Sequence, residues 1–198
     1  MSDNEEKKKE LIAQAVAAKF RAHISSRKED WIDMLKYEIE RLKIEEDREE
    51  RDKIKREIRG LIKDPLKSDY LLPIDFEERP EEEQILYIEA AYKQLTTGEI
   101  TIIDEDQHNA FLNLFISVVL EDDFKKALQW GVKLIDSYRT NMGKEYYADY
   151  MRKFIIRKFD PILLPPEEKW EKATVEEKVR MIKEAVDKIL RGRPFYFY

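Results

Sequence analysis

The chain of 198 residues contains 40% charged residues and no cysteine, and its formal net charge is −6. The absence of cysteine excludes disulfides, thiolate metal sites and cysteine nucleophiles. Five glycines and seven prolines are too few for the many turns of an all-β protein. The composition therefore predicts an all-α protein with a highly charged surface, and its abundance of lysine and glutamate resembles that of thermophile proteins.

A first helix is predicted over residues 4–24. Its larger apolar side chains recur at every fourth position and share one face, which carries Ile12, Val16, Phe20 and Ile24. Ser26, with Glu29 three residues later, has the spacing of a capping box, in which each side chain accepts a hydrogen bond from the other residue's backbone N–H. We therefore expect a second helix to begin near residue 27.

The second helix is predicted to run without a break over residues 27–62. Two apolar stripes flank residues 45–53 (EEDREERDK), which include no apolar residue, and the stripes stay in phase at 3.6 residues per turn. This long, charged N-terminal helix pair is expected to form an extended helical arm over residues 1–63. The stripes are predicted to contact a partner through Trp31, Leu35, Ile39, Leu42, Ile54, Ile58 and Leu61.

Residues 64–198 are predicted to form a compact bundle of about five helices with an aromatic C-terminal tail. Pro80 suits the first turn of a helix that Gly98 ends, and residues 99–103 are expected to be a connector. Two more helix starts are indicated by capping-box spacings at Asp104–Gln107 and Thr174–Glu177.

Helical spacing within the bundle predicts which side chains face the core. In the helix after Asp104, the spacing places His108, Phe111 and Phe115 on one apolar face, which is expected to be buried. Gly143 is expected to separate two further helices.

The sequence predicts no catalytic site. It has no glycine-rich phosphate loop, no G-x-S-x-G and no H-E-x-x-H motif. Asp104, Asp106 and His108 could in principle hold a metal ion, but no second histidine lies nearby and Asp104 is expected to cap a helix. We therefore expect no enzyme, no catalytic residue, no metal and no cofactor, and no small-molecule ligand is evident.

The C-terminal tail (RGRPFYFY) combines basic and aromatic residues. Aromatic and arginine side chains serve as anchors at protein interfaces, and aromatic rings also stack on nucleic-acid bases. The tail either folds back on its own bundle, docks on a neighbouring protein or contacts nucleic acid. Its candidate partner contacts are Phe195, Tyr196, Phe197 and Tyr198.

These features predict a non-enzymatic interaction or assembly subunit of a larger intracellular complex, in which the arm and the tail contact a protein partner or a second copy. The alternative is an accessory or structural protein of a nucleic-acid complex for transcription, replication, defence or viral packaging. Its candidate contacts are Arg152, Lys153, Arg157, Lys158, Arg191 and Arg193. The sequence contains neither a signal-peptide pattern nor a membrane-spanning run, which predicts a cytoplasmic location without a membrane partner.

Overall fold

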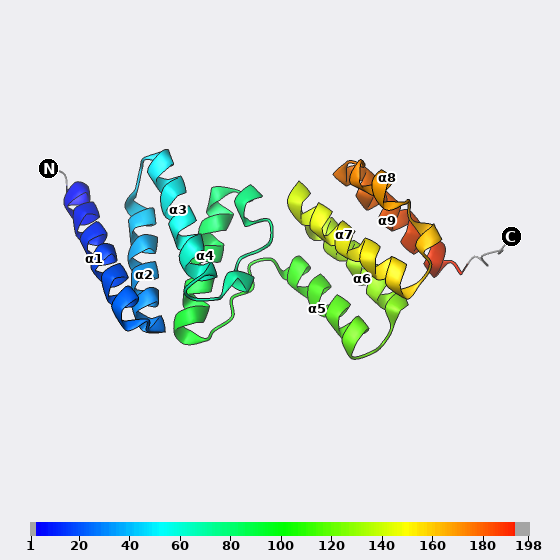
Figure 1. The fold of residues 1–198 in the computed structure, drawn as a ribbon, viewed down its shortest axis with the longest axis horizontal. Coiled ribbons are helices and arrows are strands. Elements are labelled where there is room, and N and C mark those ends of the chain that lie inside the picture. The colour runs from blue at the N-terminus through cyan, green and yellow to red at the C-terminus, as the bar shows by residue number, and fades with distance from the viewer. Residues whose placement is uncertain (1–2, 193–198) are drawn as a thin grey trace. The chain divides into compact units, whose positions relative to one another are not determined.

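The computed structural model describes residues 3–192, and this part of the chain forms nine α-helices and no strand (Figure 1). The all-α prediction is therefore confirmed. The helices are α1 (Asp3–Ser25), α2 (Lys28–Ile44), α3 (Arg48–Lys63), α4 (Glu81–Thr97), α5 (Glu105–Val119), α6 (Phe124–Ser137), α7 (Asn141–Lys158), α8 (Glu167–Glu171) and α9 (Val175–Leu190), with short 3-10 helices η1 (Asp69–Leu71), η2 (Phe76–Glu78) and η3 (Pro161–Leu163).

The helices pack into two compact units. Unit 1 ends at Ile103 and contains α1 to α4, whereas unit 2 begins at Asp104 and contains α5 to α9. This boundary differs from the predicted one between residues 63 and 64, because α2, α3 and α4 share one hydrophobic core. The N-terminal helices are therefore part of a packed unit and do not form a separate arm.

The predicted continuous helix over residues 27–62 is wrong, because α2 ends at Ile44 and α3 begins at Arg48. The Glu45 carboxylate accepts hydrogen bonds from the backbone N–H groups of Glu46 and Asp47 at 2.9 and 3.0 Å. The Asp47 carboxylate caps α3 by accepting from the Glu50 N–H at 2.9 Å. The polar stretch therefore forms a stabilised turn, and the two apolar stripes lie in one core.

The predicted capping box at Ser26 is also absent. Ser26 has a φ of 53°, and α2 begins only after Arg27. The polar groups of this turn bond differently, because the Ser25 hydroxyl donates to the Asp30 carboxylate and the Arg27 N–H donates to the Ser25 oxygen. Helices α1 and α2 thus form a hairpin and lie side by side (Figure 1).

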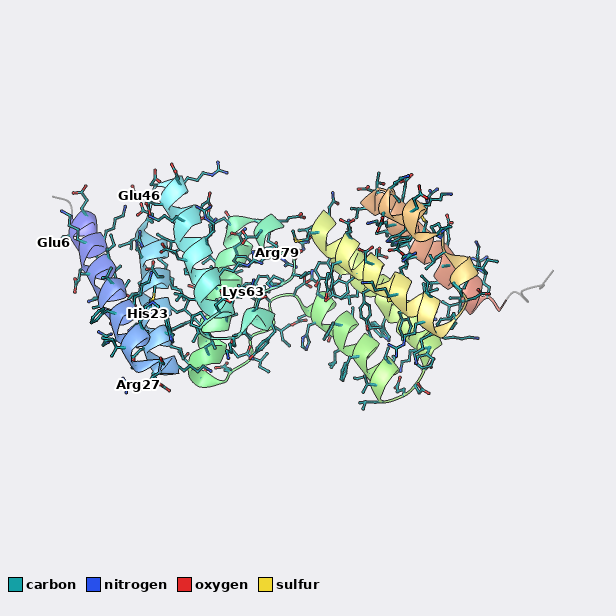
Figure 2. All side chains as sticks on the ribbon, in the orientation of Figure 1. Glu6, His23, Arg27, Glu46, Lys63 and Arg79 are labelled. Carbon is teal, nitrogen blue, oxygen red and sulfur yellow. The ribbon has the colours of Figure 1, made fainter. Side chains whose placement is uncertain are left out.

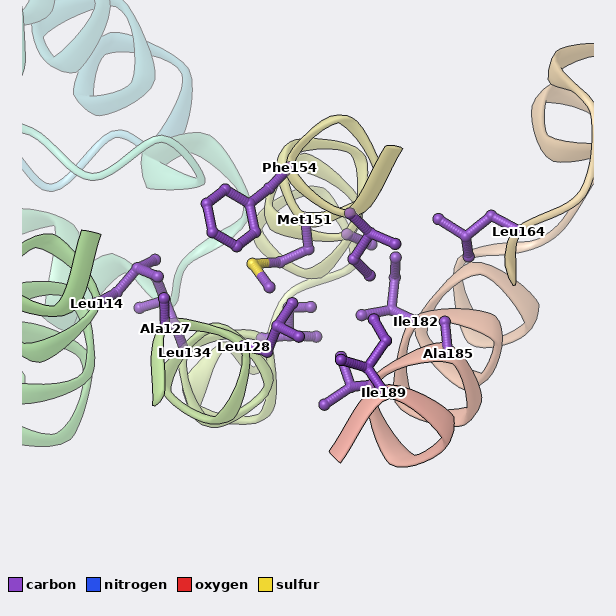
Figure 3. Close-up of a cluster of buried hydrophobic side chains, with 14 of the residues drawn as sticks. Leu114, Ala127, Leu128, Leu134, Met151, Phe154, Leu164, Ile182, Ala185 and Ile189 are labelled. Carbon is purple, nitrogen blue, oxygen red and sulfur yellow. The ribbon is translucent and has the colours of Figure 1, made fainter. Parts of the chain in front are cut away.

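Unit 2 packs α6, α7 and α9 around a core that includes Leu128, Met151 and Ile182, whose side chains gather in Figure 3. Gly143 lies in the first turn of α7 and does not separate two helices, which corrects the prediction. A Cβ atom at Gly143 would lie 2.0 Å from Cδ1 of Tyr138. The glycine therefore permits a close approach between the start of α7 and the Tyr138 ring.

Several predicted helix boundaries are confirmed. Gly98 ends α4 with a φ of 74°, and residues 99–103 are a connector. The capping box of Thr174 and Glu177 forms both of its hydrogen bonds, at 2.9 and 3.3 Å. Asp104 accepts from the Gln107 N–H at 3.0 Å, whereas the Gln107 side chain donates to the Ser137 carbonyl.

Candidate interaction surfaces

The structure places most of the predicted contact residues of the arm inside unit 1. Trp31 is half-buried, with its ring edge-on to His23 at a centroid distance of 5.0 Å. The other six residues are buried in the core, because the α2 and α3 stripes pack together. They offer no surface to a partner while unit 1 keeps this fold. These six residues are Leu35, Ile39, Leu42, Ile54, Ile58 and Leu61.

Helix α1 exposes a different apolar surface, which sequence reasoning did not place outside. We define the outer face of α1 as Ile12, Val16, Phe20 and Ile24, whose exposed fractions are 42, 62, 69 and 70%. The opposite side of the helix is buried and consists of Leu11, Ala15, Ala18 and Ala22. Helix α1 is therefore apolar on both sides, a pattern typical of a helix that is covered on both sides.

Helix α5 repeats this arrangement in unit 2. We define the outer face of α5 as Phe111, Leu112, Phe115 and Val119, which are 43 to 57% exposed. The buried side carries Gln107, Ala110, Leu114 and Ser117. The prediction that His108, Phe111 and Phe115 face the core is wrong, because α5 packs on α6 with Ala110 and Leu114 in the core and leaves the other side of the helix exposed.

Both ends of α1 are held by carboxylates of the neighbouring segments. Near its N-terminal end, Lys8 Nζ lies 2.7 Å from Glu45 Oε1, and this hydrogen bond lowers the pKa of the Glu45 carboxyl and raises the pKa of Lys8. At the other end, hydrogen bonds from Ser25 and then Arg27 lower the pKa of Asp30. Figure 2 marks the two ends of the helix with Glu6 and with His23 and Arg27. These contacts fix which side of α1 faces outward.

The predicted nucleic-acid residues do not form one basic surface. Arg152 is buried, pairs with Glu167 and lies 5.4 Å from the centroid of the Trp170 ring. Arg191 pairs with Asp187 at 2.7 Å, and Lys158 Nζ lies 4.1 Å from the centroid of the Phe124 ring. Lys153 and Arg157 are exposed on α7.

The predicted contacts of the tail, Arg193 and Phe195, Tyr196, Phe197 and Tyr198, lie outside the described residues. Within residues 3–192, no three metal-ligating side chains come together to hold an ion. Over the same part of the chain, no helix combines the length and apolar character needed to cross a membrane.

Unit 2 also has a surface groove of about 560 Å³ beside α9, whose wall mixes basic and acidic side chains such as Lys172, Arg180 and Glu184. Glu177, in the same wall, is engaged in the α9 capping box. The groove thus borders residues that hold the scaffold together.

No protein-family model, curated protein or solved structure matches the chain. The outer faces of α1 and α5 are therefore the features from which we infer a function.

Proposed function

We propose that this chain is a non-enzymatic assembly subunit that binds another protein through the outer face of α1. The observation that carries the proposal is the orientation of that helix. Ala15, Ala18 and Ala22 are buried, while Ile12, Val16, Phe20 and Ile24 face outward. Contiguous exposed apolar patches of this kind mark interaction sites on folded proteins.

The orientation of α1 opposes the ordinary preference of the hydrophobic effect. Each square ångström of apolar surface left in water costs about 25 cal/mol, so a helix free to rotate would bury its larger side chains and expose its alanines. The ion pair of Lys8 with Glu45 and the contacts of Arg21 and Ser25 with Asp30 link α1 to its neighbouring segments in the opposite orientation. A partner on the outer face would remove this exposed area from water.

The shape of the outer face indicates the kind of partner. Its residues recur every fourth position over twelve residues, which gives a stripe about 18 Å long at 1.5 Å per residue. A stripe of this length matches the apolar face of one helix. We therefore expect the partner to present an apolar helical surface.

Site-specific photo-crosslinking in the native host tests the proposal. A benzophenone amino acid at Phe20, on the outer face, is expected to give a protein adduct of one defined mass. The matched control carries the same probe at Lys36, which is exposed on α2, and is expected to give none. Equal labelling at the two positions, or no adduct at Phe20, would contradict the proposal.

The nucleic-acid alternative rests on a smaller basic surface than the sequence predicts. Lys153 and Arg157 are exposed one turn apart on α7, and Lys158 follows them. Fluorescence anisotropy with single- and double-stranded DNA and RNA across salt concentrations tests it, because phosphate contacts weaken as salt rises. Salt-dependent binding that is lost in Lys153→Glu/Arg157→Glu supports this alternative, and no binding at low salt excludes it.

A further inference from the structure

We propose that the occupant of the outer face of α1 is the outer face of α5 in a second copy of this chain. This inference rests on the proposed function and names the partner. Copies of the chain would then associate head to tail, with unit 1 of one copy on unit 2 of the next.

The two faces are alike in their apolar character and in the way that the structure exposes them. Each lies on a helix that buries one side, which includes alanine and one leucine, and exposes a second apolar side. Each face also includes phenylalanine, through Phe20 on α1 and through Phe111 and Phe115 on α5. Two such stripes can cover one another as packed helices do.

The charges beside the two faces have opposite signs. Residues 5–30 include seven basic and five acidic residues, a formal charge of +2, whereas residues 104–123 include six acidic residues and no basic residue, a formal charge of −6. In both segments charges flank the apolar face, with basic residues at 7–9 and 27–28 and acidic residues at 104–106 and 121–123.

The spacing of these charges also matches. The first flanking group lies near the N-terminal end of each helix and the second lies just past its C-terminal end, so about 26 Å of helix separates them on α1 (Lys8 to Ser25) and about 21 Å on α5 (Glu105 to Val119). Opposite charges therefore meet at both ends in either helix orientation. Charge complementarity of this kind selects the partner and speeds association.

Some of these charges already have partners within their own unit. Lys8 pairs with Glu45, Arg21 and Arg27 lie beside Asp30, and Glu121 pairs with Lys126. Other charged side chains at the edges of the faces are exposed. The basic ones beside α1 are Lys7, Lys19 and Lys28, and the acidic ones beside α5 are Glu105, Asp106 and Asp122.

Pairing of like faces is less favourable by charge. Two α5 segments would bring only acidic groups together, and two α1 segments would bring mainly basic groups together. Glu5 and Glu6, which precede Lys7, would relieve part of that repulsion in an antiparallel α1 pair. A test must therefore separate pairing of unlike faces from pairing of like faces.

A contact between unlike faces has a consequence for assembly. Each copy carries one α1 face and one α5 face, so every copy can bind two neighbours, one through each face. Such a heterologous contact produces a ring where the rotation closes and an open chain where it does not. A contact between like faces would stop at a dimer.

Complementation between two variants of the full chain tests this pairing. Val16→Ser/Phe20→Ser removes apolar side chains from the α1 face, and Phe111→Ser/Phe115→Ser removes them from the α5 face. In sedimentation velocity at low salt, the wild type is expected to form species larger than a dimer as concentration rises. Self-association of each variant alone is expected to be weaker than that of the wild type by at least about tenfold. An equimolar mixture of the two variants is expected to form a 1:1 complex.

The control is Leu86→Ser/Ile162→Ser, which removes an exposed apolar side chain from α4 and from η3 and is expected to associate like the wild type. Four results overturn the inference: a monomeric wild type, self-association of the α1 variant through α5, self-association of the α5 variant through α1, or a mixture without a 1:1 complex. If Phe20 still crosslinks to a different protein in the host, the proposed function stands and only the α5 pairing falls.

Discussion

Helices α1 and α5 open the two units with the same arrangement, one side buried and a second apolar side with phenylalanine exposed, but they are held by different forces. Helix α5 contributes Ala110 and Leu114 to the core of unit 2. Helix α1 contributes only Ala18 to the described core cluster of unit 1, and its ends are linked to their neighbours by the Lys8–Glu45 ion pair and by the contacts of Arg21 and Ser25 with Asp30. The attachment of α1 therefore depends on charge more than that of α5 does.

The largest expected effect comes from core substitutions that destabilise one unit and leave the other unchanged. Ile58 and Ile135 are fully buried in units 1 and 2, and Ile→Ala substitutions at such sites cost about 2 to 5 kcal/mol of unfolding free energy. We expect Ile58→Ala to lower only the unfolding transition of unit 1 and Ile135→Ala only that of unit 2. Denaturation followed by NMR signals from each unit measures this.

Phe20→Ala is the control for these core variants, because Phe20 is exposed on α1. It is expected to change the unfolding free energy by about 0.5 kcal/mol or less. A joint shift of both unfolding transitions in either core variant would show that the two units unfold as one, which would contradict the prediction of two independent transitions.

The next effect concerns two glycines that differ in their surroundings. A Cβ atom at Gly143 would meet the buried Tyr138 ring, whereas at Gly60 in α3 nothing lies within 4 Å. Gly143→Ala is expected to destabilise unit 2 by about 1 to 3 kcal/mol through overpacking. Gly60→Ala is expected to stabilise unit 1 by about 0.5 to 1 kcal/mol, because alanine favours the helix.

Thermal and denaturant unfolding of both variants measures these opposite signs. Stabilisation by both substitutions would mean that Tyr138 moves aside at little cost. In that case helix propensity alone, without close packing, would account for the two results.

Features that depend on neighbouring residues were predictable from the sequence. The capping box at Thr174–Glu177 and the stop at Gly98 involve residues within one turn, and the structure confirms both. The turn after Ile44 had a comparable signal, because Asp47 and Glu50 have the capping spacing. The uniform polarity of residues 45–53 hid it, since a solvated helix and a turn are equally compatible with such a stretch.

Features that depend on tertiary packing were not predictable in the same way. The stripe from Ile12 to Ile24 was visible, but its outward direction follows from contacts of Lys8 with Glu45 and of Arg21 and Ser25 with Asp30 that only the fold brings together. A second signal existed in Ala15, Ala18 and Ala22, which share the opposite side of α1. Apolar residues on both sides of a helix indicate two coverings without saying which is internal.

A smaller effect tests how α1 is held. The pKa values of Glu45 and Asp30 are lowered in the folded state, so their contribution to stability is present above the ordinary carboxyl pKa and is lost as pH falls through the folded values, below about pH 4. Acid is therefore expected to loosen α1 more than α5. Hydrogen exchange of backbone amides, corrected for the intrinsic rate, measures the difference.

Glu45→Gln is the matched variant for this pH test. It is expected to loosen α1 at neutral pH and to reduce the further effect of acid. Equal loss of protection in α1 and α5 on acidification would mean that the ion pairs do not hold α1.

The smallest expected effect has the opposite sign and comes from Glu38 on α2. Burial raises the pKa of Glu38, although Arg41 beside it acts in the other direction. A raised carboxyl pKa means that stability is present below the unfolded pKa and decreases as pH rises through the folded value. Glu38→Gln is therefore expected to stabilise unit 1 at pH 7 by about 1 kcal/mol or less, with no gain in acid.

The contrast between Glu38→Gln and Glu45→Gln makes this last measurement decisive for unit 1. Arg41 keeps Glu50 as a partner at 3.2 Å when Glu38 is neutral, so removing the Glu38 charge does not leave the guanidinium alone. Lys8 has Glu45 as its ion-pair partner at 2.7 Å, and losing that charge removes the contact that holds the N-terminal part of α1. Denaturant unfolding of both variants at pH 7 and in acid should therefore give opposite signs at pH 7, and equal signs would show that burial, not pairing, governs both carboxylates.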